Sequence, residues 1–193
     1  MMAPELQRLS DGSVRLIDLA PWFVGVILEL PNLLDSDQPE VVSRRLYPDP
    51  SDDAEQQKDW EKFVRPELFA LVASARDIVL NDIGTMAPSS VEAKEATDFS
   101  VWQLDIPETH IQGWISALNV ARLTLSSRYT IEDDDMLEPD GDIDEGDGDT
   151  GEPEFDKKHF AVARVHLLGW LQQLLIEAES PPPEDFDLLR GLE

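Results

Sequence analysis

The chain has 193 residues, 41% of them hydrophobic, so it can bury a core and is the length of about one domain. Its 41 acidic and 15 basic residues give a formal net charge of −26, which excludes a broad cationic surface for nucleic acid or anionic membrane. It has no cysteine, which excludes disulfides, zinc–thiolate sites and thiol nucleophiles. No signal-peptide pattern opens it, and its longest apolar run, residues 19–28, is half a bilayer span, so we expect a soluble, cytoplasmic protein.

The chain opens with a predicted β-hairpin. Residues 6–9 and 14–19 are the strands, and Asp11-Gly12 between them is a strong turn signal. Pro21 suits the first turn of a helix, and residues 22–34 then have the composition of a buried helix. A proline-rich connector at 47–50 follows.

Two helices are predicted next. Ser51 is expected to cap a helix that runs to about Val64 and breaks at Arg65-Pro66. The second covers 67–82. Its apolar face consists of Leu68, Leu71, Val72, Ala75, Ile78 and Val79.

The second half of the chain is predicted to contain two long helices. Ser89 and Glu92 have capping-box spacing for a short helix, and alternation over 102–106 favours a strand. The long helices follow at 107–128 and 156–178. The apolar face of the last one is expected to consist of Phe160, Ala163, Leu167, Leu168, Trp170, Leu171, Leu174 and Leu175.

Between the two long helices lies an acidic insert. Residues 132–156 contain 14 acidic residues and neither Lys nor Arg, so the insert is predicted to be disordered. Residues 181–193 open with three prolines and are predicted to form a loose tail. The expected fold is therefore mostly α: one bundle-like helical domain over 1–180, with an N-terminal β-hairpin and a disordered acidic insert.

The motifs of catalysis and of cofactor binding are missing from the sequence. It has no glycine-rich phosphate loop, no Gly-x-Ser-x-Gly elbow and no His-Glu-x-x-His pair. His110, His159 and His166 are scattered, and we expect them on helix surfaces rather than on a metal. We therefore assign no catalytic residue, no cofactor and no metal ligand, and consider an enzyme the less favoured class.

The acidic insert resembles a calcium loop only in part. Asp140, Asp142 and Asp144 occupy positions 1, 3 and 5 of an EF-hand loop. Position 6 is Glu145 instead of Gly, and position 12 is Gly151 instead of Glu. We expect weak binding of divalent cations by the insert and no specific calcium site.

Two arginines project onto the apolar stripes of the long helices. Arg122 falls within the stripe of 107–128, and Arg164 within that of 156–178. A buried guanidinium stays charged and needs a partner, and Asp82 is the best candidate. The alternative is a shared anion pocket, with Asn119 at its edge.

Several of these residues resemble a known family. The segment from Gly113 to Leu125, followed by Ser127-Arg128, is similar to the signature of an uncharacterised actinobacterial domain family of unknown function. Gly169-Trp170-Leu171-Gln172 resembles its second signature. One departure is Val120, which stands where the family usually has Asp. The family's genes often lie beside one for a Clp-protease adaptor, which implies a role related to proteolysis.

The function that we expect is protein binding. The hypothesis is a non-catalytic interaction or regulatory domain with a protein partner, linked to proteolysis. The rival is a small-anion sensor or enzyme with a buried arginine pocket. The residues expected to bind are Arg122, Arg164, Asn119 and Arg128. A mobile polyanion can speed association with a basic partner, although the charge run is equally explained as a device for solubility.

Deletion of residues 132–156 is expected to leave the melting temperature unchanged or higher, because the repulsion among 14 carboxylates is removed. Thermal unfolding followed by circular dichroism measures this. Loss of cooperative unfolding would show that the insert is part of the fold.

Overall fold

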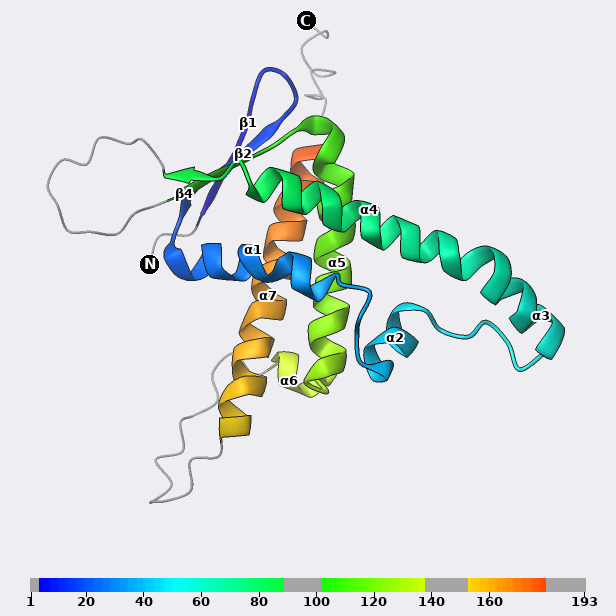
Figure 1. Ribbon diagram of the computed structural model, residues 1–193. Helices are drawn as coiled ribbons and strands as arrows, with labels where there is room; N and C mark the ends of the chain where they lie inside the picture. The colour runs from blue at the N-terminus through cyan, green and yellow to red at the C-terminus, as the bar shows by residue number, and fades with distance from the viewer. Residues whose placement is uncertain (1–3, 89–101, 138–152, 180–193) are drawn as a thin grey trace, which may run out of the picture.

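The computed structural model describes residues 4–88, 102–137 and 153–179, and it is mostly helical (Figure 1). The strands are β1 (Glu5–Arg8), β2 (Val14–Leu19), β3 (Ala87–Pro88) and β4 (Trp102–Ile106). The helices are α1 (Pro21–Leu33), α2 (Glu40–Leu46), α3 (Ala54–Asp59), α4 (Arg65–Ile83), α5 (Ile111–Arg128), α6 (Asp133–Leu137) and α7 (Pro153–Glu179). A π-helical turn (Trp60–Val64) joins α3 to α4, and a 3-10 turn (Glu108–His110) precedes α5. The predicted capping box at Ser89 and Glu92 and the predicted tail lie outside the described residues.

The predicted hairpin is confirmed, but it belongs to a larger sheet. The strand order is β1-β2-β4-β3, and every neighbouring pair is antiparallel. Gly12 in the hairpin turn has φ 84°, a conformation that glycine adopts without steric cost. The sheet forms because β4 pairs with β2, placing Leu16 opposite Leu104.

An irregularity in β2 turns Leu19 into the core. The register of β2 against β4 shifts between Leu16 and Leu19, and Asp18 there has φ 59°. A bulge inserts a residue and so breaks the strict alternation of faces. Val14 and Leu16 face the core by ordinary alternation, and because of the bulge Leu19 faces it too, so all three are fully buried.

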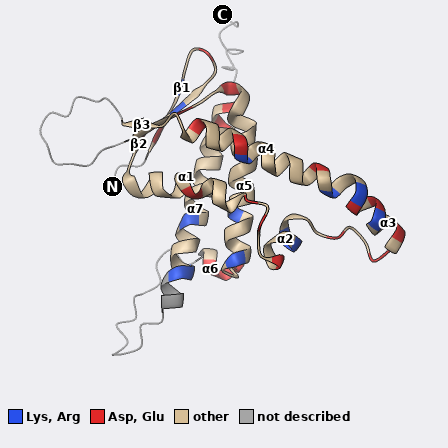
Figure 2. Cartoon of the chain, viewed as in Figure 1, with Lys and Arg blue, Asp and Glu red and all other residues tan. Residues whose placement is uncertain are grey.

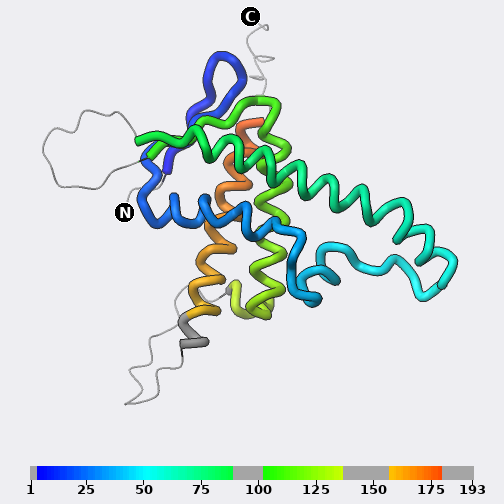
Figure 3. The backbone as a smooth tube through the Cα atoms, in the orientation of Figure 1, coloured from blue at the N-terminus to red at the C-terminus, as the bar shows by residue number. Residues whose placement is uncertain are grey.

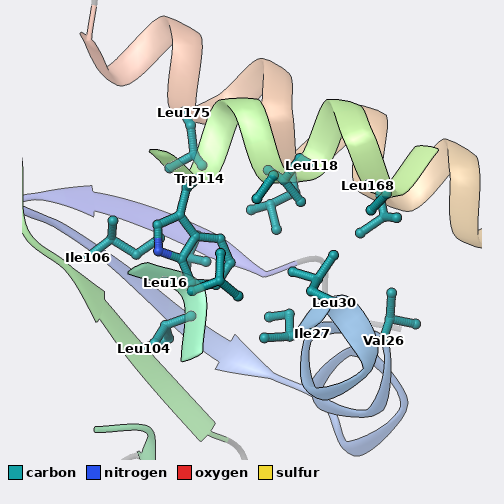
Figure 4. Packing of buried hydrophobic residues seen from close by; sticks show 14 of the residues in the cluster. Leu16, Val26, Ile27, Leu30, Leu104, Ile106, Trp114, Leu118, Leu168 and Leu175 are labelled. Atoms are coloured by element: carbon teal, nitrogen blue, oxygen red, sulfur yellow. The ribbon is translucent and has the colours of Figure 1, made fainter. Parts of the chain in front are cut away.

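The core lies between the sheet and the helices α1, α4, α5 and α7. Helices α5 and α7 run antiparallel side by side, and α1 crosses them (Figures 1 and 3). Leu16, Leu104 and Ile106 of the sheet pack around Trp114, and Leu30, Leu118 and Leu168 continue this apolar cluster (Figure 4). Among the described residues, no helix is both long and apolar enough to cross a bilayer.

The predicted apolar face of the last helix is wrong at its edges. Phe160 is 69% exposed and Ala163 is also exposed. Leu168, Leu171 and Leu175 are buried as predicted, and the buried stripe is completed by Ala161 and Val165, which were not predicted. The difference arises because α7 contacts mainly one neighbour, α5, so its buried stripe is narrower than its apolar surface.

The predicted break at Arg65-Pro66 is also wrong. Residues 54–83 form one continuous helical rod through the π-helical turn, since both junction residues have right-handed helical angles. Proline is tolerated in the first turn of a helix, and the wide π turn before it accommodates the missing N–H. The cap is Asp53 rather than Ser51: its Oδ1 accepts from the N–H of Glu55 at 2.8 Å.

The acidic insert predicted to be disordered at 132–156 is too long, because α6 and the start of α7 lie within it. After α5, Thr130 has φ 49°, and the N–H of Ile131 donates to the carbonyl of Ser126 at 2.9 Å, which ends the helix. Residues 133–137 are then helical, with Met136 packed against the core. Asp135 pairs with Lys158 of α7 at 2.7 Å. Both ends of the predicted insert are thus ordered, and its remaining part, 138–152, lies outside the described residues.

These boundaries sharpen the prediction for the acidic segment. Replacement of residues 138–152 by a Gly/Ser linker of equal length should leave the melting temperature unchanged or raise it, because eight carboxylates are removed. Extending the replacement through 133–137 should lower it, by roughly 2–4 °C for each kcal/mol lost, because Met136 leaves the core. Calorimetry of the two variants checks both outcomes, and equal melting temperatures would contradict a structural role for α6.

Acidification should weaken the contact that α6 makes with α7. The side chain of Lys158 and the backbone N–H of Glu132 hold the pKa of Asp135 below its ordinary value. A lowered pKa in the folded state stabilises the protein above the unfolded-state pKa, and this contribution is lost as the pH falls.

Candidate functional site

A buried carboxylate joins α4 to the start of α5. Asp82 is 2% exposed, and its Oδ2 accepts from the indole Nε1 of Trp114 at 2.8 Å. Its two carboxylate oxygens lie 2.9 and 3.0 Å from Nδ1 of His110, and Oδ1 also accepts from Asn81 at 3.2 Å. The carboxylate is therefore fully engaged, and the expectation that it neutralises Arg122 or Arg164 is wrong. Sequence projection placed Asp82 on the inner face of its helix but could not identify what it would meet there.

His110 has one of the features of a catalytic base, because a buried carboxylate orients its ring. Catalysis by such a pair also needs a nucleophile or a substrate group within hydrogen-bond reach of the other ring nitrogen. In the described part of the chain, the imidazole ring of His110 makes hydrogen bonds to Asp82 alone. We assign the cluster of Asp82, His110 and Trp114 to positioning of the helices. His159 and His166 are exposed, as expected.

Arg122 crosses from α5 to α7. Its Nη1 donates to Oε1 of Gln172 at 2.7 Å, and Gln172 in turn donates to the carbonyl of Ile115 at 3.2 Å. The guanidinium lies flat against Gly169, where a Cβ would come within 3.3 Å of its Cζ and Nε. Nε of Arg122 is buried and has no hydrogen-bond partner among the described residues. Gly169 therefore makes room for the arginine, whose partner is neutral.

Arg164 is held differently. It forms an ion pair with Glu29 of α1, and its side chain is only 11% exposed whereas that of Glu29 is 45% exposed. The prediction that both arginines are hydrogen-bonded is confirmed. They do not share a pocket, because Arg164 points to α1 and Arg122 points to a hollow between α5 and α7.

Arg128 and Asn119, the other two residues expected to bind, do not lie together either. Arg128 donates to Oε1 of Gln38 at 2.6 Å, and Nε2 of Gln38 donates to the carbonyl of Asp35 at 2.9 Å. Arg128 thus holds the loop between α1 and α2. Asn119 is exposed on α5 and lies beside Arg122.

The hollow beside Arg122, called here the Arg122 hollow, has a volume of about 490 Å³. Its lining contains no carboxylate among the described residues. It combines polar groups with apolar ones: Asn119, Arg122, Met136, Val165, His166, Gly169, Trp170, Gln172, Gln173 and Ile176. Trp170 is 36% exposed and Ile176 is 41% exposed, so the apolar part is open to contact.

A second, more apolar depression lies on the other side of Asn119. It has a volume of about 490 Å³, and α4, α5 and the end of α2 form its walls. We call it the α4–α5 groove. Its apolar lining consists of Leu46, Tyr47, Leu68, Leu71, Val72, Ala75, Ile78, Val120 and Leu123. Asn119 borders both depressions, so they form one surface along the outer side of α5.

The groove forms because α4 extends beyond the helices and strands that cover its inner half. The predicted apolar face of α4 is the right one, but only its inner half is covered: Val79 is fully buried, whereas Leu71 is 66% exposed. The outer half projects with α3 away from the body (Figures 1 and 3). Gly113 permits the close contact at the base, because a Cβ there would come within 2.6 Å of Ile78.

Aromatic contacts close the far end of the groove. The ring of Tyr47 lies 4.2 Å from that of Phe69, measured between centroids, and Tyr47 is 7% exposed. Burial raises the pKa of the Tyr47 hydroxyl, while the charge of Arg65 opposes that shift. Tyr47 therefore stays neutral at neutral pH, so the paired rings of Tyr47 and Phe69 add no charge to this end of the groove.

A third depression, of about 700 Å³, lies beside the hairpin turn. Its lining is mainly polar and includes Asp11, Asp82 and Glu108, together with the pair that Arg15 forms with Asp105 at 2.6 Å. Within the described ranges, no group of three or more His, Asp or Glu side chains is arranged to hold a metal ion. We therefore assign no catalytic or metal-binding function to this depression.

The fold and these surfaces define a small, mostly helical α+β domain with an uncovered apolar groove. The chain belongs to the DUF2017 family, a domain of unknown function, whose family model matches residues 5–179. This confirms the resemblance to an uncharacterised domain family. Searches of curated proteins and of solved structures gave no match.

The groove was not predicted from the sequence. The signal that could have indicated it is the apolar pattern of α4, which continues from Val79 back to Leu68 and so extends into the outer half of the helix. The hollow was predicted in part, through Arg122 and Asn119.

The buried carboxylate and the arginine should differ in their effect on stability. Asp82→Ala removes the acceptor of Trp114 and His110, so it should lower the free energy of unfolding by about 3 kcal/mol. Arg122→Ala should cost only about 1 kcal/mol, because its partner Gln172 is neutral and leaves no buried carboxylate unpaired. Urea denaturation of the two variants measures the difference. A larger loss for Arg122→Ala would mean that the arginine, not Asp82, is the central polar contact.

Proposed function

We propose that the chain is a non-catalytic protein-interaction or regulatory domain that binds its partner along the outer side of α5. The observation that carries the proposal is the uncovered half of α4. Its apolar face continues past the body, leaves Leu71 66% exposed and forms a groove that no described element fills. Exposed apolar surface with a polar rim is typical of protein-binding sites.

The chemistry of the surface indicates the kind of partner segment. Apolar side chains would fill the α4–α5 groove, where Leu71 and Val72 lie exposed or partly exposed. An acceptor oxygen would face Arg122, whose only hydrogen bond to a described residue is the one to Gln172. Asn119, between the two depressions, can both donate and accept. An apolar centre flanked by an arginine is the arrangement found at interaction hot spots.

The acidic segment supports partner binding on the same face. It begins after Met136 of α6, which lines the Arg122 hollow, and it adds eight carboxylates over 138–152. Such a charge would steer a partner that has basic residues around its apolar segment and would raise the association rate at low salt.

We also propose that the interaction has a role in proteolysis. It rests on the resemblance described from the sequence, in which genes of the family stand beside a Clp-protease adaptor gene. In that context the partner would be a component or a regulated substrate of a protease.

One observation favours the rival function, binding of a small anion. Arg122 lines a hollow of about 490 Å³ and has no carboxylate partner among the described residues, so its charge is available to an anion. Titration of the protein with phosphate, sulfate and small carboxylates by calorimetry would reveal such a ligand, and Arg122→Gln should abolish its binding.

The interaction is tested by capture from the native host with the full chain as bait, followed by measurement of affinity with the purified, identified partner. Leu71→Asp places a charge in the groove and should weaken binding at least tenfold. Leu80→Asp is the matched control, because Leu80 is 42% exposed on the same helix but lies outside the groove. Its affinity should equal that of the unchanged chain.

Two results would contradict the proposal. One is equal affinity for Leu71→Asp and Leu80→Asp, which would place the partner elsewhere. The other is the absence of any specific partner together with saturable binding of an anion that Arg122→Gln abolishes, which would establish the rival function.

A further inference from the structure

The end of α7 brings the chain to the α4–α5 groove. Glu179, the last residue of α7, accepts a hydrogen bond from Nε2 of Gln112, and Gln112 lines the groove. The carbonyl of Ala178 accepts from Arg8 at 2.7 Å, so this end of the helix is fixed at two points. Whatever follows residue 179 therefore starts beside the groove, at the end opposite Tyr47.

The residues that follow have the length and composition to occupy the groove. From Gln112 to Leu123 the groove follows twelve residues of α5, or about 17 Å of helix. Residues 181–193 can span up to about 45 Å when extended. After three prolines they carry four apolar side chains within seven positions, Phe186, Leu188, Leu189 and Leu192. These match a groove that needs apolar side chains.

The charges of the two parts are complementary. Residues 181–193 contain four acidic residues and one arginine. The far end of the groove adjoins Arg45 of α2, which is exposed and has no partner among the described residues. Arg65 also lies near Tyr47, where it pairs with Glu61. Figure 2 shows that other Lys and Arg residues lie on α3, α5 and α7, so charge favours the groove without singling it out.

We infer that residues 181–193 of this chain bind in its own α4–α5 groove, with Phe186 and the leucines against Leu71 and Val72. Because the segment is tethered at Glu179, its effective concentration at the groove is in the millimolar range, so a weak contact is sufficient. A second copy or a separate protein has no such advantage at ordinary concentrations. Competition between this segment and a partner for the groove is the regulatory consequence, and that part rests on the proposed function.

The test uses distances between spin labels in the full chain. The protein contains no cysteine, so Ala73→Cys and Arg190→Cys give two unique labelling sites. Ala73 is exposed on α4 and lies outside the groove lining. Binding of the segment should give one narrow distance distribution. Leu71→Asp should broaden it, as should Phe186→Asp with Leu189→Asp, whereas Leu80→Asp should leave it narrow.

Three outcomes would overturn the inference. They are a broad distribution in the chain that carries only the labels, a narrow one that survives Leu71→Asp, and a narrow one that disappears on dilution with unlabelled protein. The last would assign the groove to a second copy. Since all of these measurements are made without a partner, their result is independent of the proposed function.

The competition is measured separately, with the identified partner. Phe186→Asp with Leu189→Asp should raise its affinity several-fold by freeing the groove. An unchanged affinity, when the labels show the segment bound, would mean that the partner does not use the groove.

Discussion

The carboxylate of Asp82 is the contact on which the surface of this domain depends. Buried between α4 and α5, it binds the indole of Trp114 and the imidazole of His110, and so fixes where α4 crosses the start of α5. Breaking the hydrogen bonds of a carboxylate in a low-dielectric interior costs much free energy, so α4 and α5 cross in one arrangement. Together with the close contact of Gly113 with Ile78 and the hydrogen bond from Arg76 to the carbonyl of Pro31 at 3.0 Å, this group sets the direction of α4 beyond the crossing and with it the α4–α5 groove.

Helix α5 serves the core and the surface at once. Trp114, Leu118 and Leu125 point inward, whereas Ser116 and Asn119 point outward along the two depressions. Since the two sets do not overlap, substitutions on the outer side can change binding with little effect on stability.

Local signals in the sequence were sufficient for most elements of the fold, but not for the short helices α2 and α6. Asp11-Gly12 predicted the hairpin, Pro21 the start of α1, and the apolar periodicity the two long helices. The hydrogen bonding of Arg122 and Arg164 was also predictable, because a guanidinium on an apolar stripe must find an acceptor. The partners were not, since Gln172 and Glu29 come from helices whose relative positions no local pattern contains. For the same reason, local patterns could not predict that β2 pairs with β4 or that Trp114 donates to Asp82. The break expected at Pro66 failed because a π turn absorbed the proline.

The rod formed by residues 54–83 has a mechanical consequence. It is fixed at Asp82 near one end, at Arg76, which donates to the carbonyl of Pro31 at 3.0 Å, and at Phe69, whose ring lies 4.2 Å from that of Tyr47. Beyond Phe69 the rod extends about 22 Å along its axis to Ala54. A tilt of only ~10° about Phe69 would displace the tip by roughly 4 Å, given that length. A force applied at the tip would therefore act through this lever arm on the contact of Phe69 with Tyr47, at the edge of the α4–α5 groove.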